Sequence, residues 1–212
     1  MSEHDTEASI SIAAPGEGEE MARAELYGLL ARLWLAPPDD ELLAQFRVAV
    51  TQAPESGGHL EAPWESLVGA MRATTAAQAA DEYDTLFQGV GKPEVFTYGS
   101  YYLSGALNDK PLAHLRTDLA ALGLGRDESR AETEDHVSYV FEVMRYLIAG
   151  DDAGVSNLEQ QRRFFRAHVQ PWIERLCDAV QAHPRASSWA AVAAFTRAFV
   201  EVETQAFDML ES

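Results

Sequence analysis

Acidic side chains and a histidine gather in one short segment of this 212-residue chain, Glu132-Thr133-Glu134-Asp135-His136. Carboxylates and an imidazole can bind a metal ion or exchange protons, so this segment is the first candidate for chemistry. A di-iron helical bundle, however, needs Glu-x-x-His on two helices, and none of the six histidines follows a Glu at that spacing. A metal protein or enzyme built on Glu132, Asp135 and His136 would need further ligands from elsewhere, and we keep it as an alternative.

The same segment also has a purely structural interpretation, as the start of a helix. Thr133 or Glu132 would cap the helix, and the two acids that follow would lie at the positive end of its dipole. A protonated His136 would be unfavourable there, which predicts a neutral, hydrogen-bonded imidazole. A strong apolar stripe predicts a helix over 133–149, which Gly150 would end.

Other catalytic patterns are missing from the sequence. Cys177 lies in an apolar helical pattern without a cue for a base, which predicts a buried, inert thiol. The run Gly89-Val90-Gly91-Lys92 has neither the spacing nor the Ser/Thr of a phosphate loop. The sequence therefore predicts no enzyme, no metal and no cofactor.

A second segment carries aromatic side chains beside a loop. Tyr83, Leu86 and Phe87 have the spacing of one helix face, for which core packing is the ordinary explanation. The Gly- and Pro-containing loop 88–99 follows, and four more aromatic residues lie in it or just after it: Phe96, Tyr98, Tyr101 and Tyr102. Flat apolar surfaces with polar tips suit the capture of a peptide in a groove.

The charge of the chain limits its partners. The formal net charge is -18, and Lys92 and Lys110 are the only lysines. Such a surface repels nucleic acid and anionic lipid and attracts a basic peptide, although the acidity could equally serve solubility or adaptation to salt. No apolar run is long enough to span a bilayer, and the start of the chain lacks the basic region of a signal peptide. We expect a cytoplasmic protein without stable membrane insertion.

The elements that must position these residues are all helices. Residues 1–18 have the composition of a disordered acidic tail, and 19–212 are expected to form one all-α domain of about ten helices with a hinge loop near 123–132. Pro37-Pro38 stop the first helix, and Asp39 or Asp40 caps the second. The predicted later helices cover about 63–71, 75–87, 100–107, 111–122, 133–149, 155–168, 171–182 and 187–210.

Taken in order, these motifs resemble the TorD/DmsD family of redox-enzyme maturation chaperones, with NarJ-type proteins as more distant relatives. The resemblance rests on Tyr-x-x-Leu-Phe at 83–87, Tyr98-Gly99-Ser100-Tyr101-Tyr102-Leu103, Glu132-x-x-Asp135-His136, His168-x-x-Pro171-Trp172 and His183-Pro184. It extends over nearly all of the chain from about residue 20. Two positions depart from the family pattern: Thr133 and Val90 stand where the family often has proline.

The resemblance implies an all-helical chaperone without catalytic turnover. Members bind the N-terminal leader, often a twin-arginine signal, of a molybdenum- or tungsten-pterin oxidoreductase, and hold its apo catalytic subunit until the cofactor is inserted. The matching leader-binding positions are Trp34, Tyr83, Leu86, Phe87, Tyr98, Ser100, Asp135 and His136. The client, the export or loss of its leader, binding of a guanine nucleotide, and the choice between a monomer and a dimer swapped through 123–132 stay open.

Overall fold

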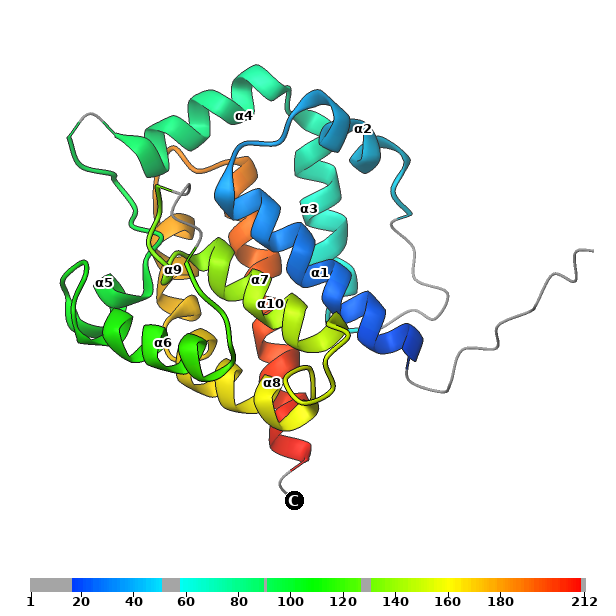
Figure 1. Ribbon diagram of the computed structural model, residues 1–212. Coiled ribbons are helices and arrows are strands. Elements are labelled where there is room, and N and C mark those ends of the chain that lie inside the picture. The colour runs from blue at the N-terminus through cyan, green and yellow to red at the C-terminus, as the bar shows by residue number, and fades with distance from the viewer. Residues whose placement is uncertain (1–16, 51–57, 90, 127–130, 211–212) are drawn as a thin grey trace, which may run out of the picture.

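The computed structural model describes residues 17–50, 58–89, 91–126 and 131–210. These residues form ten α-helices and two π-helical turns, and no strand occurs among them (Figure 1). The predicted all-α fold is confirmed. The elements are α1 Glu17–Leu35, α2 Asp40–Val48, α3 Glu61–Ala73, α4 Ala76–Tyr83, η1 Asp84–Gln88, α5 Gly99–Ser104, α6 Lys110–Ala121, α7 Val137–Ala149, α8 Leu158–Phe164, η2 Phe165–Val169, α9 Ile173–Gln181 and α10 Ser188–Met209.

Two predicted features lie partly outside the described residues. Positions 1–16 of the expected acidic tail are not described, and its last two positions, 17 and 18, are the first residues of α1. Positions 127–130 of the expected hinge are likewise outside the described ranges. The hinge therefore stays a prediction, and the helical part of the chain begins two residues before its expected start.

Local signals set several helix boundaries. Helix α1 ends at Leu35, just before Pro37-Pro38. Asp39 caps α2, because its Oδ1 accepts a hydrogen bond from the amide of Leu42 at 2.8 Å. Thr75 begins α4 with a capping box that includes the side chain of Gln78. These boundaries agree with the sequence prediction.

Two helices expected to be continuous contain a π-helical turn instead. The predicted helix 75–87 is α4 followed by η1, and the predicted helix 155–168 is α8 followed by η2. In η1 the amide of Gly89 donates to the carbonyl of Asp84, a span of five residues, at 3.0 Å. Gly89 has a φ of +43°, and a Cβ there would collide with the carbonyl of Lys92, so the end of this turn requires glycine.

The predicted start of the 133–149 helix was wrong. Helix α7 begins at Val137, and His136, not Thr133 or Glu132, is its N-cap. Residues 133–136 form a turn instead, in which the amide of His136 donates to the carbonyl of Thr133 at 3.0 Å. His136 is extended and pairs with Tyr98 in an isolated antiparallel bridge. This pairing between distant segments overrides the local capping signal.

The core is built around two long neighbouring helices. Helix α1 lies along α7 at the centre of the molecule, and α10 packs against both α3 and α9 (Figure 1). The largest fully buried side chains include Trp34, Trp172 and Trp189. Cys177 is buried among apolar side chains of α9, as expected, and burial raises the pKa of its thiol to about 12.

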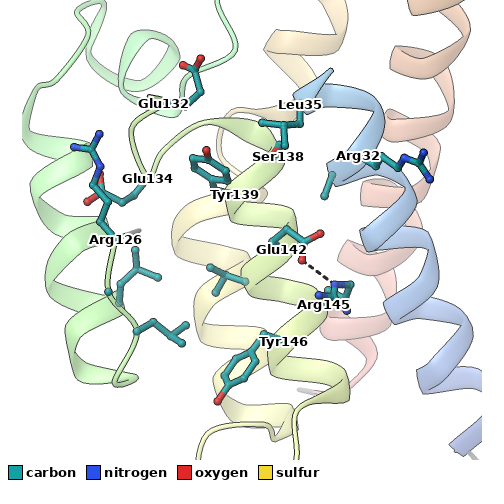
Figure 2. Close-up of a pocket in the computed structure, with 15 residues that line it drawn as sticks. Arg32, Leu35, Arg126, Glu132, Glu134, Ser138, Tyr139, Glu142, Arg145 and Tyr146 are labelled. Atoms are coloured by element: carbon teal, nitrogen blue, oxygen red, sulfur yellow. Dashed lines mark hydrogen bonds and ion pairs between the residues drawn. The ribbon is translucent and has the colours of Figure 1, made fainter. Parts of the chain in front are cut away.

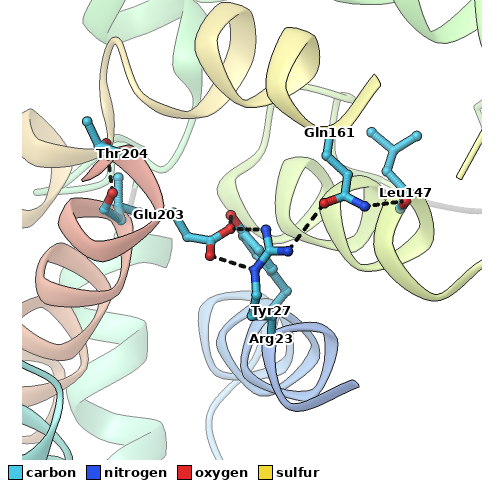
Figure 3. Close-up of polar contacts among 7 residues, drawn as sticks. Arg23, Tyr27, Leu147, Gln161, Glu203 and Thr204 are labelled. Atoms are coloured by element: carbon cyan, nitrogen blue, oxygen red, sulfur yellow. Dashed lines mark hydrogen bonds and ion pairs between the residues drawn. The ribbon is translucent and has the colours of Figure 1, made fainter. Parts of the chain in front are cut away.

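A buried ionic network ties α1 to the C-terminal helices (Figure 3). The guanidinium of Arg23 donates to both carboxylate oxygens of Glu203, each at 2.8 Å, and the hydroxyl of Tyr27 donates to Glu203 at 3.0 Å. The Gln161 side chain accepts from Arg23 and donates to the carbonyl of Leu147 at 3.1 Å. The network therefore connects α1, α10, α8 and α7.

Candidate functional site

The aromatic half of the candidate residues lies in the core, at the end of α1. Trp34 is fully buried and donates its indole N–H to Thr196 of α10 at 3.0 Å. The hydroxyl of Tyr83 donates to the carbonyl of Leu35 at 2.7 Å. The Phe87 ring packs edge-on against both Tyr83 and Trp34, with ring centroids 5.0 and 5.8 Å apart, respectively. Together with the buried Leu86, these side chains fix η1 against α1 and α10.

The polar half is buried as well, in the turn before α7. One carboxylate oxygen of Asp135 accepts from the amide of Ser100 at 2.8 Å, and the other accepts from the hydroxyl of Thr133 at 2.7 Å. The Nδ1 of His136 accepts from the amide of Ser138 at 3.3 Å. Burial lowers the pKa of His136 to about 4, so its imidazole is neutral, as predicted.

Glu132 and Tyr98 extend the polar half. The half-buried Tyr98 donates its hydroxyl to the carboxylate of Glu132, and its ring packs edge-on against His136 with centroids 5.2 Å apart. Burial, and next the charge of Glu132, raises the pKa of Tyr83 to about 12. The contacts thus group the eight candidate residues into two clusters, one at the end of α1 and one at the turn before α7.

A cavity of about 700 Å³ opens beside this region, over α7, with α1 on one side and residues of α6 and the following loop on the other (Figure 2). We call it the α1–α7 cavity. Its apolar lining comes from Leu35 of α1, from Leu119 and Leu124, and from Val143 of α7. Further lining residues are Ala31, Arg32, Gly125, Arg126, Glu132, Glu134, Ser138, Tyr139, Glu142, Arg145 and Tyr146. The lining therefore combines apolar and aromatic side chains with charged groups of both signs.

A second cavity, of about 790 Å³, lies beside η1, and we call it the η1 cavity. Three carboxylates line it, those of Asp81, Asp84 and Glu94, together with the single guanidinium of Arg185. The rest of the lining is Leu35, Ala36, Pro37, Tyr83, Thr85, Gln88 and Gly89. Leu35 lines both cavities, so they adjoin at the end of α1.

Sequence reasoning missed most of the residues that line these cavities. Tyr139, Val143 and Tyr146 recur at helical spacing on α7, outside its stripe of buried residues. This second, weaker stripe is the sequence signal from which the cavity wall could have been predicted. Conversely, the aromatic residues expected to form a groove beside Tyr98 line neither cavity. Phe96 packs on Tyr101 at 4.2 Å between centroids, and Tyr102 stacks on Trp172 at 5.8 Å.

The metal alternative gains no support from this geometry. Both oxygens of Asp135 accept hydrogen bonds from the protein, and Nδ1 of His136 caps α7. Within the described ranges, no three His, Cys, Asp or Glu side chains are grouped to hold a metal ion. Nor does any helix among these residues have the length and apolarity needed to cross a bilayer.

Comparison with known proteins finds similarity in sequence to one family. A family model described as nitrate reductase delta subunit matches residues 54–178, which include both candidate segments. Chaperone protein TorD from Vibrio cholerae serotype O1 is 24% identical over 204 residues in the El Tor Inaba strain and equally so in the Classical Ogawa strain. The match extends over 89% of this chain and 93% of each relative.

Proposed function

Because this chain belongs to the nitrate reductase delta subunit family, we propose that it is a cytoplasmic maturation chaperone for a redox enzyme. It is a chaperone and not an enzyme, in keeping with its TorD relatives. Its client is the apo catalytic subunit of a molybdenum- or tungsten-pterin oxidoreductase, which it binds through a basic N-terminal leader. Binding holds the subunit until the cofactor is inserted and delays export.

The adjoining cavities are the observation that carries this proposal. A twin-arginine leader is basic first and apolar afterwards. The η1 cavity has three carboxylates against one guanidinium, and the α1–α7 cavity offers apolar and aromatic walls. Because Leu35 lines both, one extended peptide can place its basic part in the first and its apolar part in the second.

The eight candidate residues have a mainly positioning role in this proposal. Trp34, Leu86 and Phe87 are buried, and the contact between Trp34 and Phe87 holds η1 against the end of α1. Ser100 and Asp135 hold the turn that carries Glu132. Tyr83 also lines the η1 cavity, so it can touch the leader.

Apolar burial should supply most of the affinity. The gain is about 25 cal/mol for each Å² of apolar surface removed from water. An exposed charge pair adds only about 0.2–1 kcal/mol and is screened by salt. Added salt should therefore slow association more than it weakens the final complex.

Calorimetry with a synthetic leader tests the proposal. The probe has two adjacent arginines before an apolar stretch of about 12 residues. Tyr146→Ser removes an aromatic wall of the α1–α7 cavity and should weaken binding by about fivefold or more. Leu103→Ser is the matched control, because Leu103 is similarly exposed, 41% against 38% for Tyr146, and lines neither cavity.

Two results would overturn the proposal. One is a wild-type chain that binds no leader of this composition at micromolar concentrations. The other is equal loss of affinity in Tyr146→Ser and Leu103→Ser, which would place the leader away from the α1–α7 cavity. Mass spectrometry of proteins captured by the wild-type chain, but not by Tyr146→Ser, would identify the client.

A further inference from the structure

Glu132, at the rim of the α1–α7 cavity, differs from the other carboxylates around it. Among the described residues its side chain has a single hydrogen-bond partner, the hydroxyl of Tyr98, and no basic partner. The neighbouring carboxylates of Glu134 and Glu142 are already paired with arginine side chains. Glu134 accepts two hydrogen bonds from Arg116, at 2.8 and 2.9 Å, and Glu142 accepts from Arg145 at 2.8 Å.

The surroundings of Glu132 make an unpaired charge costly. The side chain is half-buried, and burial raises the pKa of its carboxyl group without any compensating cation in the described ranges. A carboxylate that has lost water is stabilised strongly by a cation that supplies hydrogen bonds. A ligand that carries a positive group can therefore stabilise the Glu132 carboxylate by pairing with it.

The carboxylate is also held in place. Tyr98 donates to it from one side, and the ring of Tyr98 rests against the buried His136. Figure 2 shows Glu132 at one end of the cavity, beyond Tyr139 and on the same side as Leu35. Leu35 also lines the acidic η1 cavity, so Glu132 lies at the end of the α1–α7 cavity where the basic part of a leader would enter.

We propose that Glu132 is the counter-ion for one arginine side chain of the bound leader, with Tyr98 as the residue that positions it. This inference rests on the proposed function. Arginine suits the site better than lysine because a planar guanidinium can donate two hydrogen bonds to one carboxylate. With Tyr98 occupying one side of the carboxylate, the remaining lone pairs accept from the guanidinium.

A double-mutant cycle tests this pairing. Glu132→Gln is measured by calorimetry against the leader probe and against two versions in which each arginine in turn is glutamine. We expect about tenfold weaker binding of the arginine probe by Glu132→Gln. The loss should nearly vanish with one of the two glutamine probes, which identifies the paired arginine.

Matched variants separate pairing from general acidity and from damage to the fold. Glu174→Gln removes an exposed carboxylate that lines neither cavity, and should change affinity less than twofold. Tyr98→Phe should reduce the coupling between Glu132 and the arginine while leaving binding of the glutamine probe unchanged. Thermal unfolding of Glu132→Gln should be unaltered or shifted upward, because an unpaired, half-buried charge is removed.

The outcomes distinguish the two proposals. If the wild type binds the probe and Glu132→Gln binds it equally well, the counter-ion assignment is wrong while the chaperone function stands. A uniform loss of affinity for all three probes also contradicts it, since that result shows no coupling to an arginine. If the wild type binds none of the probes, the proposed function itself fails.

Discussion

At the scale of single residues, His136 couples the candidate site to pH. Its imidazole is buried and accepts the cap hydrogen bond of α7, so the neutral form is required in the folded chain. Protonation would place a charge in a site with almost no water and remove the acceptor. The imidazole that could have acted as a general base therefore serves as the N-cap of α7.

We predict that His136 makes the folded chain less stable in mild acid. Its pKa is about 4 when folded and about 6.5 when unfolded, so only the unfolded chain takes up the proton between these values. Its contribution to the free energy of unfolding is complete above about pH 6.5. About 3 kcal/mol of it is lost as the pH falls to about 4.

Urea unfolding of wild type and His136→Asn across pH 4–7 measures this effect. Asparagine can still cap α7 but does not titrate, so the variant should lose less stability as the pH falls. His168, whose pKa burial also lowers, is present in both proteins and cancels in the difference. Parallel pH curves for the two proteins would show that His136 is not the titrating group.

At the scale of elements, prolines and caps made several helix ends predictable. Pro37-Pro38, Asp39 and Thr75 act within a few residues of the boundaries they set. The start of α7 could not be predicted the same way. It depends on Tyr98, nearly forty residues earlier, which pairs with His136 and holds it extended. A capping signal at Thr133 cannot reveal a partner so distant in the chain.

The start of helix α10 is also stabilised by a residue of another helix. The carboxylate of Glu82 in α4 accepts from the amides of Ser187, Ser188 and Trp189 at 2.7, 3.1 and 2.9 Å. It also accepts from the Ser188 hydroxyl at 2.5 Å. A negative group at this point satisfies free amides and complements the helix dipole. Glu82 therefore joins α4, which leads into η1, to the start of α10.

We predict that Glu82→Ala lowers the free energy of unfolding by about 1–3 kcal/mol, because it leaves amides at the start of α10 without acceptors. Hydrogen exchange of residues 187–189 should speed up as well. Asp81→Ala on the same helix is the control, since Asp81 is exposed and lies 4.0 Å from Arg185, a contact of about 0.5 kcal/mol or less. Equal effects of the two variants would mean that Glu82 does not cap α10.

At the scale of the whole molecule, the Arg23–Glu203 network holds the first and last helices together. Glu203 is 2% exposed, and its carboxylate accepts hydrogen bonds from both Arg23 and Tyr27. Burial, followed by the charge of Glu203, raises the pKa of Tyr27 well above its usual value, so its hydroxyl remains a donor. Loss of either charge leaves the other without its buried partner.

We predict that Glu203→Gln lowers the free energy of unfolding by about 3 kcal/mol. The double variant Arg23→Met with Glu203→Leu should lose less stability than the sum of the losses in Arg23→Met alone and Glu203→Leu alone. Removing one partner strands a charge, whereas replacing both leaves apolar packing. Thermal and urea unfolding of the single and double variants measure the difference. Additive losses would show that Arg23 and Glu203 act independently.

The all-α class was predictable from the helical period of apolar residues, but the cavities were not. Leu35, Glu94, Leu124 and Tyr146 come from four separate parts of the chain and meet only in the folded molecule. The motif residues were easier to find because large aromatic groups at helical spacing stand out. Large apolar side chains at helical spacing also pack into the core. The motifs therefore predicted which part of the chain forms the candidate site, but they did not predict which side chains line the cavities.

The π-helical turn η1 has a consequence for comparing this chain with its relatives. Hydrogen bonds that span five residues accommodate one residue more than an α-helical turn does. A relative that lacks one residue between Asp84 and Gln88 could close the turn as ordinary α-helix and keep α4 and the following loop in place. A one-residue gap in η1, in an alignment of this chain with a relative, would therefore indicate a deletion that changes a single turn and leaves the flanking helices unchanged.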